Sequence, residues 1–182
     1  MRIPSLKKPT LAEVQKTWLH IKSIESDNST EEPVEFEFIS VLKKDENYIK
    51  GFEYETRLKT RSDIKLGFQH AQWIAEHQDE IPELKELREK RVWYIDFPAL
   101  VVVYADGGRY VPCLHNDGGR FVIDWYGLAL GFHDCGRVAV SSKQDYRELG
   151  TLEPLGTGAL ESLERIAIAL ERLADKYAPR KK

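Results

Sequence analysis

The sequence has few of the features that mark specialised protein classes. Its 182 residues include two cysteines, too few for a disulfide scaffold. It has no apolar run near the roughly 20 residues that span a bilayer, and residues 1–9 contain no apolar signal-peptide core. Neither sign of charge dominates, and a net charge of −3 gives no global attraction to nucleic acid or to an anionic membrane. We therefore expect a cytoplasmic protein without a membrane segment.

Motifs of common enzymes are also missing. The chain contains no P-loop, no dinucleotide-binding fingerprint and no Gly-x-Ser-x-Gly nucleophile elbow. Asp96 and Asp124 each lie inside an apolar run, where a buried carboxyl group is most often a hydrogen-bonded structural residue. An acid–base set of Asp124 with His115 and His133 is the catalytic alternative. We expect a non-catalytic protein without a cofactor.

Three stretches of the second half share one pattern, in which a tight turn is followed by an arginine and an apolar run. They are residues 106–111, 117–122 and 134–139. Asp-Gly before an apolar run indicates a β-hairpin, because Asp and Gly tolerate the positive φ angles of such turns. The pattern predicts an antiparallel meander over residues 98–142.

The rest of the chain mixes the two periodicities. Alternating apolar and charged residues predict a hairpin of strands 34–42 and 48–58. Helical spacing predicts helices over residues 10–21 and 62–78, a short one from Pro82, and a C-terminal one over 157–177. We expect one α+β domain over residues 1–182, a hairpin plus a meander with helices packed on one face. Residues 1–9 form a flexible lead in this prediction, and residues 178–182 a flexible tail.

The meander carries the candidate binding residues. Arginines that open strands next to aromatic side chains fit a phosphate, a carboxylate or a nucleic-acid backbone, and the same composition is typical of protein-binding hot spots. Arg109 and Arg137 are expected about 10 Å apart at one end of the sheet. The alternative is that these arginines pair with turn aspartates and that the aromatic rings form the core. The candidates are Arg109, Arg120, Arg137, Tyr110, Trp125 and Tyr126.

Both cysteines lie two residues from a histidine, which raises a metal alternative. Cys113 with His115 and His133 with Cys135 would supply two thiolates and two imidazoles, a tetrahedral zinc set. A straight strand between the two pairs would separate them by about 40 Å, and only a reversal near Gly127 would bring them together. We therefore expect no bound zinc.

Three functions follow from these residues. The first is a small cytoplasmic binding protein that uses the meander surface for a protein partner. The second is binding of nucleic acid or a phosphate-bearing ligand through the same arginines and aromatic rings. The third is a metal-dependent or zinc-stabilised protein. The apolar stripe of the C-terminal helix adds homodimer formation as a further alternative.

Overall fold

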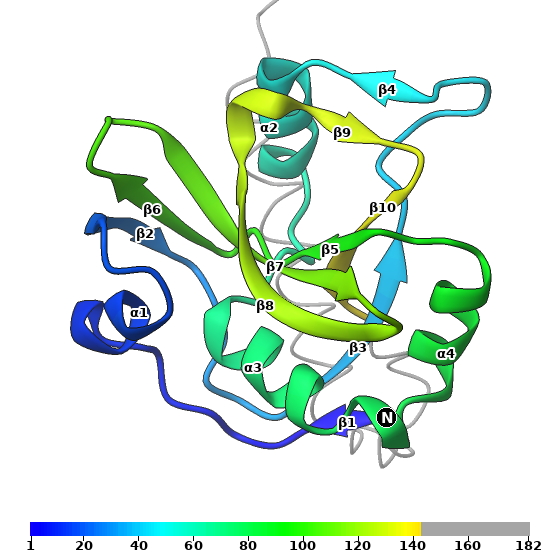
Figure 1. The fold of residues 1–182 in the computed structure, drawn as a ribbon, viewed down its shortest axis with the longest axis horizontal. Coiled ribbons are helices and arrows are strands. Elements are labelled where there is room, and N and C mark those ends of the chain that lie inside the picture. Colours follow the sequence, from blue (N-terminus) through cyan, green and yellow to red (C-terminus); the bar gives the residue numbers. More distant parts are fainter. Residues whose placement is uncertain (143–182) are drawn as a thin grey trace, which may run out of the picture. The chain divides into compact units, whose positions relative to one another are not determined.

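A computed structural model describes residues 1–142, which belong to the first of two units of the chain, Met1–Lys143. The unit mixes helices with a mainly antiparallel sheet, which confirms the α+β class (Figure 1). Its elements in chain order are β1 (Arg2–Ile3), α1 (Leu11–Thr17), β2 (Ile21–Asp27), β3 (Val34–Ile39), β4 (Tyr48–Ile49), α2 (Gly51–Lys59), α3 (Phe68–Glu76), η1 (Gln78–Glu80), α4 (Pro82–Glu89), β5 (Tyr94–Asp96), β6 (Leu100–Tyr104), β7 (Arg109–Asp117), β8 (Arg120–Gly127), η2 (Leu128–Leu130), β9 (Phe132–His133) and β10 (Gly136–Ser141).

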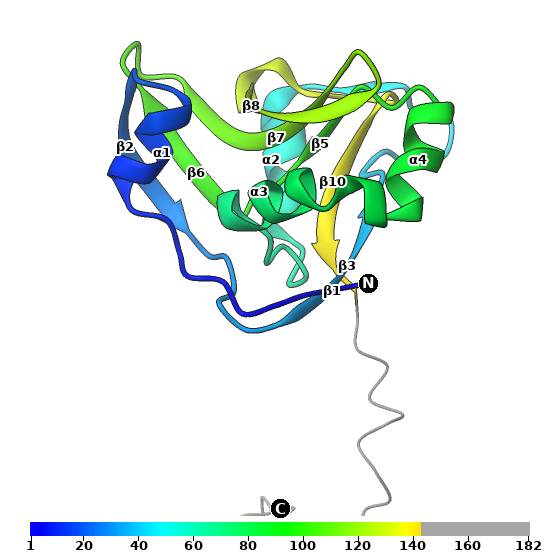
Figure 2. The same cartoon turned by 60° about the horizontal axis from the view of Figure 1, so that its bottom comes forward.

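The long strand β7 organises the main sheet. The strand order is β1-β3-β10-β5-β7-β6-β2, and β8 pairs with β7 in addition. One edge of β7 carries β8 over residues 110–117. Its other edge is shared, with β6 beside its first residues and β5 beside Cys113–His115. Figure 2 shows α1 with β2 at one end of this sheet and α4 at the other.

The predicted meander is confirmed only for β6, β7 and β8, which are joined by the turns at residues 105–108 and 118–119. After Gly127 the prediction is wrong. The chain turns through η2, and β9 pairs with β4 instead of continuing the meander. Strand β10 then lies between β3 and β5, and it runs parallel to β5. Gly131, with φ of +87°, allows this reversal because glycine adopts positive φ without steric cost.

The predicted N-terminal hairpin is half correct. β3 forms as expected, but its second strand shrinks to β4, and Gly51–Lys59 is the helix α2. Gly51, Tyr54 and Leu58 are buried while Phe52 is 72% exposed. This i, i+3, i+7 pattern of burial is helical. The strand predicted over residues 48–58 from the short alternation of apolar and acidic residues is therefore wrong beyond Ile49.

The first helix begins as predicted. Thr10 caps α1, and its hydroxyl and the Glu13 carboxylate form a reciprocal capping box. The helix ends at Thr17 instead of Ile21, which opens strand β2. Where a flexible lead was expected, residues 2–3 pair with β3, and Ile3 is completely buried.

The predicted second helix, Ser62 to Gln78, starts later, at Phe68. Gly67 precedes it, and its backbone N–H donates to Nδ1 of His70 in the first helical turn. Pro82 opens α4 as predicted, since its missing N–H and fixed φ suit a first helical position. After α4 come β5 and β6, and β6 lies within the predicted meander.

Helices cover both faces of the sheet, whereas the sequence predicted helices on one face only. Along β5, Ile95 faces a core cluster that contains the buried residues of α3 and α4. Its neighbour Tyr94 faces another cluster, which contains Tyr54 and Leu58 of α2. Successive residues of a strand point to opposite faces. A strand that is buried on both faces explains why residues 92–104 are apolar almost without interruption.

Some predictions fall outside the described residues. The C-terminal helix 157–177, the tail 178–182 and the dimer function of that helix all lie beyond residue 142, so the single domain over the whole chain stays a prediction. Among residues 1–142, no helix is both long and apolar enough to cross a membrane.

Candidate functional site

A pocket of about 340 Å³ lies beside α2. We call it the α2 pocket. The last turns of α2, the loop 60–67, the start of β7 and residues at the ends of β2, β5 and β6 form its walls. Its lining residues are Ser26, Asn28, Glu55, Leu58, Lys59, Arg61, Ser62, Ile64, Lys65, Pro98, Ala99, Val101, Arg109, Val111 and Leu128.

The pocket combines apolar residues with a cationic set of side chains. Ala99, Val111 and Leu128 are almost completely buried and belong to the apolar part. Four cationic residues line the pocket, but only one of its described lining residues is a carboxylate. The cations are Lys59, Arg61, Lys65 and Arg109, and the carboxylate is Glu55.

Two of the four cations already have strong partners. Arg109 pairs with Glu55, and its Nε lies 2.6 Å from Glu25 Oε2. These hydrogen bonds raise the pKa of its guanidinium group above its usual value. Arg61 donates to Asp63 at 2.5 Å. Both guanidinium groups are therefore held in fixed positions, and their charges are largely neutralised before any ligand arrives.

The two lysines are different. Lys59 approaches Glu55 only at 3.9 Å, and its side chain is 75% exposed. Lys65 is exposed and forms no ion pair within residues 1–142. An exposed lysine pair gains little from a contact at 3.9 Å. These two ammonium groups are the positive charges available to an incoming anion.

Backbone hydrogen bonds hold the loop walls of the pocket together. The Thr30 N–H donates to the Lys65 carbonyl at 2.9 Å, and the Asn28 N–H donates to the Ala99 carbonyl at 2.7 Å. The Asp63 carbonyl accepts from the backbone N–H of Ser141 at 2.9 Å and from its hydroxyl at 3.1 Å. Four segments far apart in sequence are thus tied to one another, so the pocket is formed before a ligand binds.

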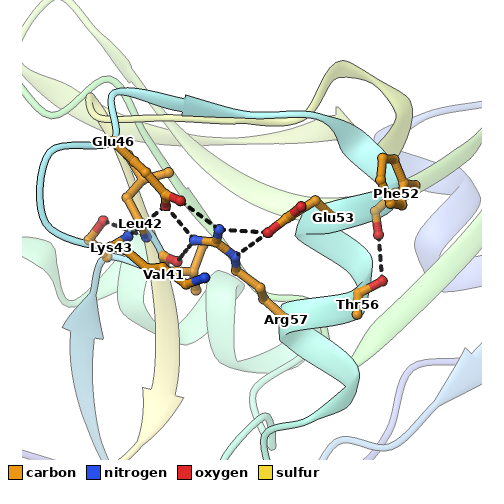
Figure 3. Close-up of polar contacts among 9 residues, drawn as sticks. Val41, Leu42, Lys43, Glu46, Phe52, Glu53, Thr56 and Arg57 are labelled. Carbon is orange, nitrogen blue, oxygen red and sulfur yellow. Dashed lines mark hydrogen bonds and ion pairs between the residues drawn. The ribbon is translucent and has the colours of Figure 1, made fainter.

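Arg57, in the last turn of α2, ties the helix to the preceding loop (Figure 3). Its guanidinium group donates to Glu46 and Glu53 and, at 2.8 Å, to the Val41 carbonyl. Glu46, as a result, has its pKa lowered to about 2, chiefly by the hydrogen bonds from Arg57 and then by the backbone N–H of Lys43. The helix that carries Glu55 and Lys59 is therefore anchored to the loop before β4.

The centre of α2 is anchored by a buried carboxyl group. The Tyr54 hydroxyl donates to Oδ2 of Asp96 at 2.5 Å, while Oδ1 of Asp96 has no hydrogen-bond partner within residues 1–142. Burial raises the pKa of Asp96 to about 8 because the charged form is not solvated there. Tyr94 and Tyr126 stack nearby with ring centroids 4.5 Å apart. Asp96 does not line the α2 pocket, so we assign it a structural role.

The structure separates the three predicted arginines. Arg109 lines the α2 pocket, whereas Arg120 pairs with Asp79 at 3.3 Å. Arg137 donates to the carbonyls of Asp134 and Gly136. The expected closeness of Arg109 and Arg137 does not occur. Arg137 lies level with Leu114 of β7 through Ile95, five residues from Arg109, or about 16 Å along the strand.

The predicted aromatic residues lie largely inside the fold. Trp125 is 7% exposed, stacks on Phe68 and donates from Nε1 to Thr17. Tyr110 is half-buried and contacts Trp18 edge-to-face. Tyr126 is also half-buried, against Tyr94. Trp125 and Tyr126 are consecutive on β8 and point to opposite faces, so they do not form one stacking platform.

The two Cys/His pairs come closer than the expected 40 Å, so that expectation is wrong. His115 on β7 lies opposite Tyr94 on β5, and the carbonyl of Cys135 accepts a hydrogen bond from the N–H of Trp93, the residue before Tyr94. Only β5 separates β7 from β10, because the chain reverses after Gly127. Within residues 1–142, no three His, Cys, Asp or Glu side chains form a group suited to a metal ion. The thiol of Cys113 is buried, which raises its pKa. Absence of zinc stays a prediction.

The sequence analysis did not identify most cationic residues of the α2 pocket. Arg109 is a candidate there, but Lys59 and Arg61 fall between the predicted strand 48–58 and the predicted helix 62–78, and Lys65 falls in the first turn of that predicted helix. Their spacing, with three cations in seven residues, was the available signal. No known protein family, curated protein or solved structure matches the chain.

Proposed function

We propose that the protein binds a small ligand that has an apolar body and an anionic group, a phosphate or a carboxylate, in the α2 pocket. The observation that carries the proposal is the set of four cations and one carboxylate next to buried apolar residues. Cationic side chains recognise such anions by charge-assisted hydrogen bonds. The apolar residues provide the contact area that small-ligand sites need.

The side chains have distinct roles in this proposal. Lys59 and Lys65 pair with the anionic group, because their ammonium groups have no strong partner within residues 1–142. Arg109, held by Glu25 and Glu55, and Arg61, held by Asp63, shape the pocket and add donors at fixed positions. Leu58, Val111 and Leu128, among others, contact the apolar body.

The pocket volume of about 340 Å³ is near the lower end of ligand pockets, which run from roughly 300 to 1,000 Å³. It suits a ligand of one ring or a short chain. We favour this function over a protein-binding meander surface because Trp125 is buried and Tyr110 is half-buried. A cytoplasmic location belongs to the proposal, since Cys113 and Cys135 are free thiols, as is usual in a reducing compartment.

The test is an NMR titration of the full chain with phenyl phosphate, which combines a ring with a phosphate group. We expect shifts at the pocket residues and at least a tenfold weaker affinity for a Lys59→Ala, Lys65→Ala double variant. Lys44→Ala, an exposed lysine outside the pocket, is the matched control and keeps the affinity. Equal binding of phenol and phenyl phosphate, or an unchanged affinity of the double variant, would refute the proposal.

A further inference from the structure

A second hollow, of about 380 Å³, lies where α4 leads into β5. We call it the Trp93 hollow. The end of α4, the residues before β5 and the turn between β7 and β8 enclose it. No carboxylate among the described residues lines it. Its lining residues are Arg88, Arg91, Val92, Trp93, Asn116 and Gly118.

Trp93 is exposed although its backbone is fixed. Its N–H donates to the Cys135 carbonyl at 2.9 Å, and its carbonyl accepts from the Asn116 N–H at 2.8 Å. Trp93 is nevertheless 57% exposed, whereas Trp125 is buried and Trp18 stacks on Tyr104. Because two hydrogen bonds fix its backbone, only side-chain freedom is lost when a ligand covers this large ring, which makes it a ready stacking surface.

Arg91 occupies a position where glycine is the usual residue. After α4, the N–H groups of Arg91 and Val92 donate to the carbonyls of Arg88 and Leu87, the two hydrogen bonds of a Schellman motif. This motif places Arg91 in the left-handed region, with φ of +57°, where a β-carbon is disfavoured. A strained non-glycine residue is an indication of function when its side chain serves a site. Here that side chain lines the hollow.

The two guanidinium groups of the hollow have no acidic partner in the part of the chain that the structure describes. Neither Arg88 nor Arg91 forms an ion pair within residues 1–142. Arg88 makes only a long hydrogen bond of 3.4 Å to the amide oxygen of Gln78. The side-chain amide nitrogen of Asn116 donates to the Val92 carbonyl, also at 3.4 Å. The side-chain oxygen of Asn116 accepts no hydrogen bond from residues 1–142. The hollow thus offers one ring face, two cations and one amide.

We infer that the Trp93 hollow binds a nucleotide. The base stacks on the indole of Trp93, as bases stack on exposed aromatic side chains in nucleic-acid-binding proteins. The phosphate pairs with Arg88 and Arg91, since guanidinium groups match phosphate oxygens. The Asn116 amide lies within the same hollow, and amides hydrogen-bond base edges. With a net charge of −3 and two cations in the hollow, the site suits one nucleotide unit, either free or within a single strand.

The test uses NMR of the full chain, followed through the Trp93 indole N–H, with AMP and UMP as probes. Adenosine and inorganic phosphate alone serve as partial ligands, and both should bind at least tenfold more weakly than AMP. If the source is a free nucleotide, AMP binds at least as tightly as a single-stranded RNA hexamer. If the source is a strand, the hexamer binds more tightly and its affinity falls with added salt.

Arg91→Gly is the decisive variant. Glycine suits the left-handed conformation of residue 91, so the thermal midpoint should stay the same or rise, while AMP affinity falls at least tenfold. Trp93→Ala should weaken AMP binding to a similar extent. Lys85→Ala, on the exposed face of α4, is the control, and the Lys59→Ala, Lys65→Ala variant should bind AMP normally.

Each of the following results would overturn the inference. AMP, UMP and the hexamer could all fail to perturb the Trp93 signal, or Arg91→Gly could leave the AMP affinity unchanged. Tighter binding of the acidic tripeptide Glu-Phe-Glu than of AMP would assign the hollow to a protein partner. A loss of AMP binding in the Lys59→Ala, Lys65→Ala variant would instead place nucleotide binding in the α2 pocket.

Discussion

At the residue scale, the buried carboxyl group of Asp96 links stability to pH. Burial raises its pKa to about 8 from 3.8. The folded protein therefore keeps this proton up to about pH 8, whereas the unfolded chain loses it near pH 3.8. Since the folded state binds more protons across this window, the contribution of Asp96 to stability is lost as the pH rises through it. Its nearest titratable neighbours are Tyr54, Tyr94, Cys113 and Tyr126, which are all uncharged there.

His70 contributes the opposite slope at lower pH. Burial lowers the pKa of its imidazole from 6.5 to about 4, so the unfolded chain binds the proton first as the pH falls below 6.5. The two effects oppose one another between about pH 4 and 6.5. Between about pH 6.5 and 8, only the Asp96 slope remains.

We predict that the free energy of unfolding falls from pH 6.5 to pH 8 by up to about 1.4 kcal/mol per pH unit, and that Asp96→Asn removes this slope. Asparagine has nearly the same shape, and its carbonyl oxygen still accepts from Tyr54, but it does not titrate. Urea denaturation at several pH values checks the prediction, with Asp124→Asn on the exposed side of β8 as the control. A wild-type stability that is flat over this range contradicts it.

Residue chemistry was partly predictable from sequence. Asp96 stands out as a carboxylate within an apolar run, and it is indeed buried. The role of Arg109 was half predicted. Its position at the start of β7 follows from the Asp-Gly turn, but its partners Glu25 and Glu55 come from 84 and 54 residues away in sequence. Tertiary partners of this kind leave no trace in local periodicity.

At the element scale, α2 shows why a segment can be assigned to the wrong structure. Over Gly51–Lys59, the alternation of Phe52 and Tyr54 with Glu53 and Glu55 fits a strand, while Gly51, Tyr54 and Leu58 fit a helix. A window of nine residues does not separate the two periods well. The decision comes from tertiary contacts, namely the Tyr54–Asp96 hydrogen bond and the Arg57 network (Figure 3).

We predict that Arg57→Ala lowers the free energy of unfolding by roughly 1–3 kcal/mol, because it removes charged hydrogen bonds to Val41 and two carboxylates. Lys90→Ala, which removes an exposed ion pair with Glu86, should change stability by less than about 1 kcal/mol. Urea denaturation of both variants measures the difference. Equal stability of the two variants would show that the network does not anchor α2.

At the scale of the whole molecule, β10 holds the described unit together. It is the last strand within residues 1–142, yet it lies between β3 and β5 in the sheet. The sequence predicted β10 as the end of a meander, because an Asp-Cys-Gly turn precedes it. Its true neighbours pair with it across about 40 and about 100 residues of chain, as Ile95–Arg137 and Ile39–Val138 show. Such long-range pairing cannot be derived from turn patterns.

This central position leads to a prediction about cooperativity. Ala139 of β10 is completely buried, and it packs in the cluster that also contains residues of α3 and α4. Ala139→Asp places a carboxyl group in this core without a partner, at a cost of several kcal/mol. The whole stability of a domain is only about 5–15 kcal/mol. We therefore expect the variant to lose its near-ultraviolet circular dichroism throughout, including the signals of Trp18 and Trp125 at the far end of the sheet.

Val122→Asp provides the matched comparison, since Val122 is 42% exposed on β8, a strand that pairs with β7 beside the main strand order. Its new carboxylate stays hydrated, so the spectrum and the thermal midpoint should remain close to those of the wild type. Because β10 lies between β3 and β5 in the sheet, a charge in that strand should unfold both halves of the sheet in a single transition. Retention of the Trp18 and Trp125 signals in Ala139→Asp would mean that β2, β6, β7 and β8 fold independently of β10.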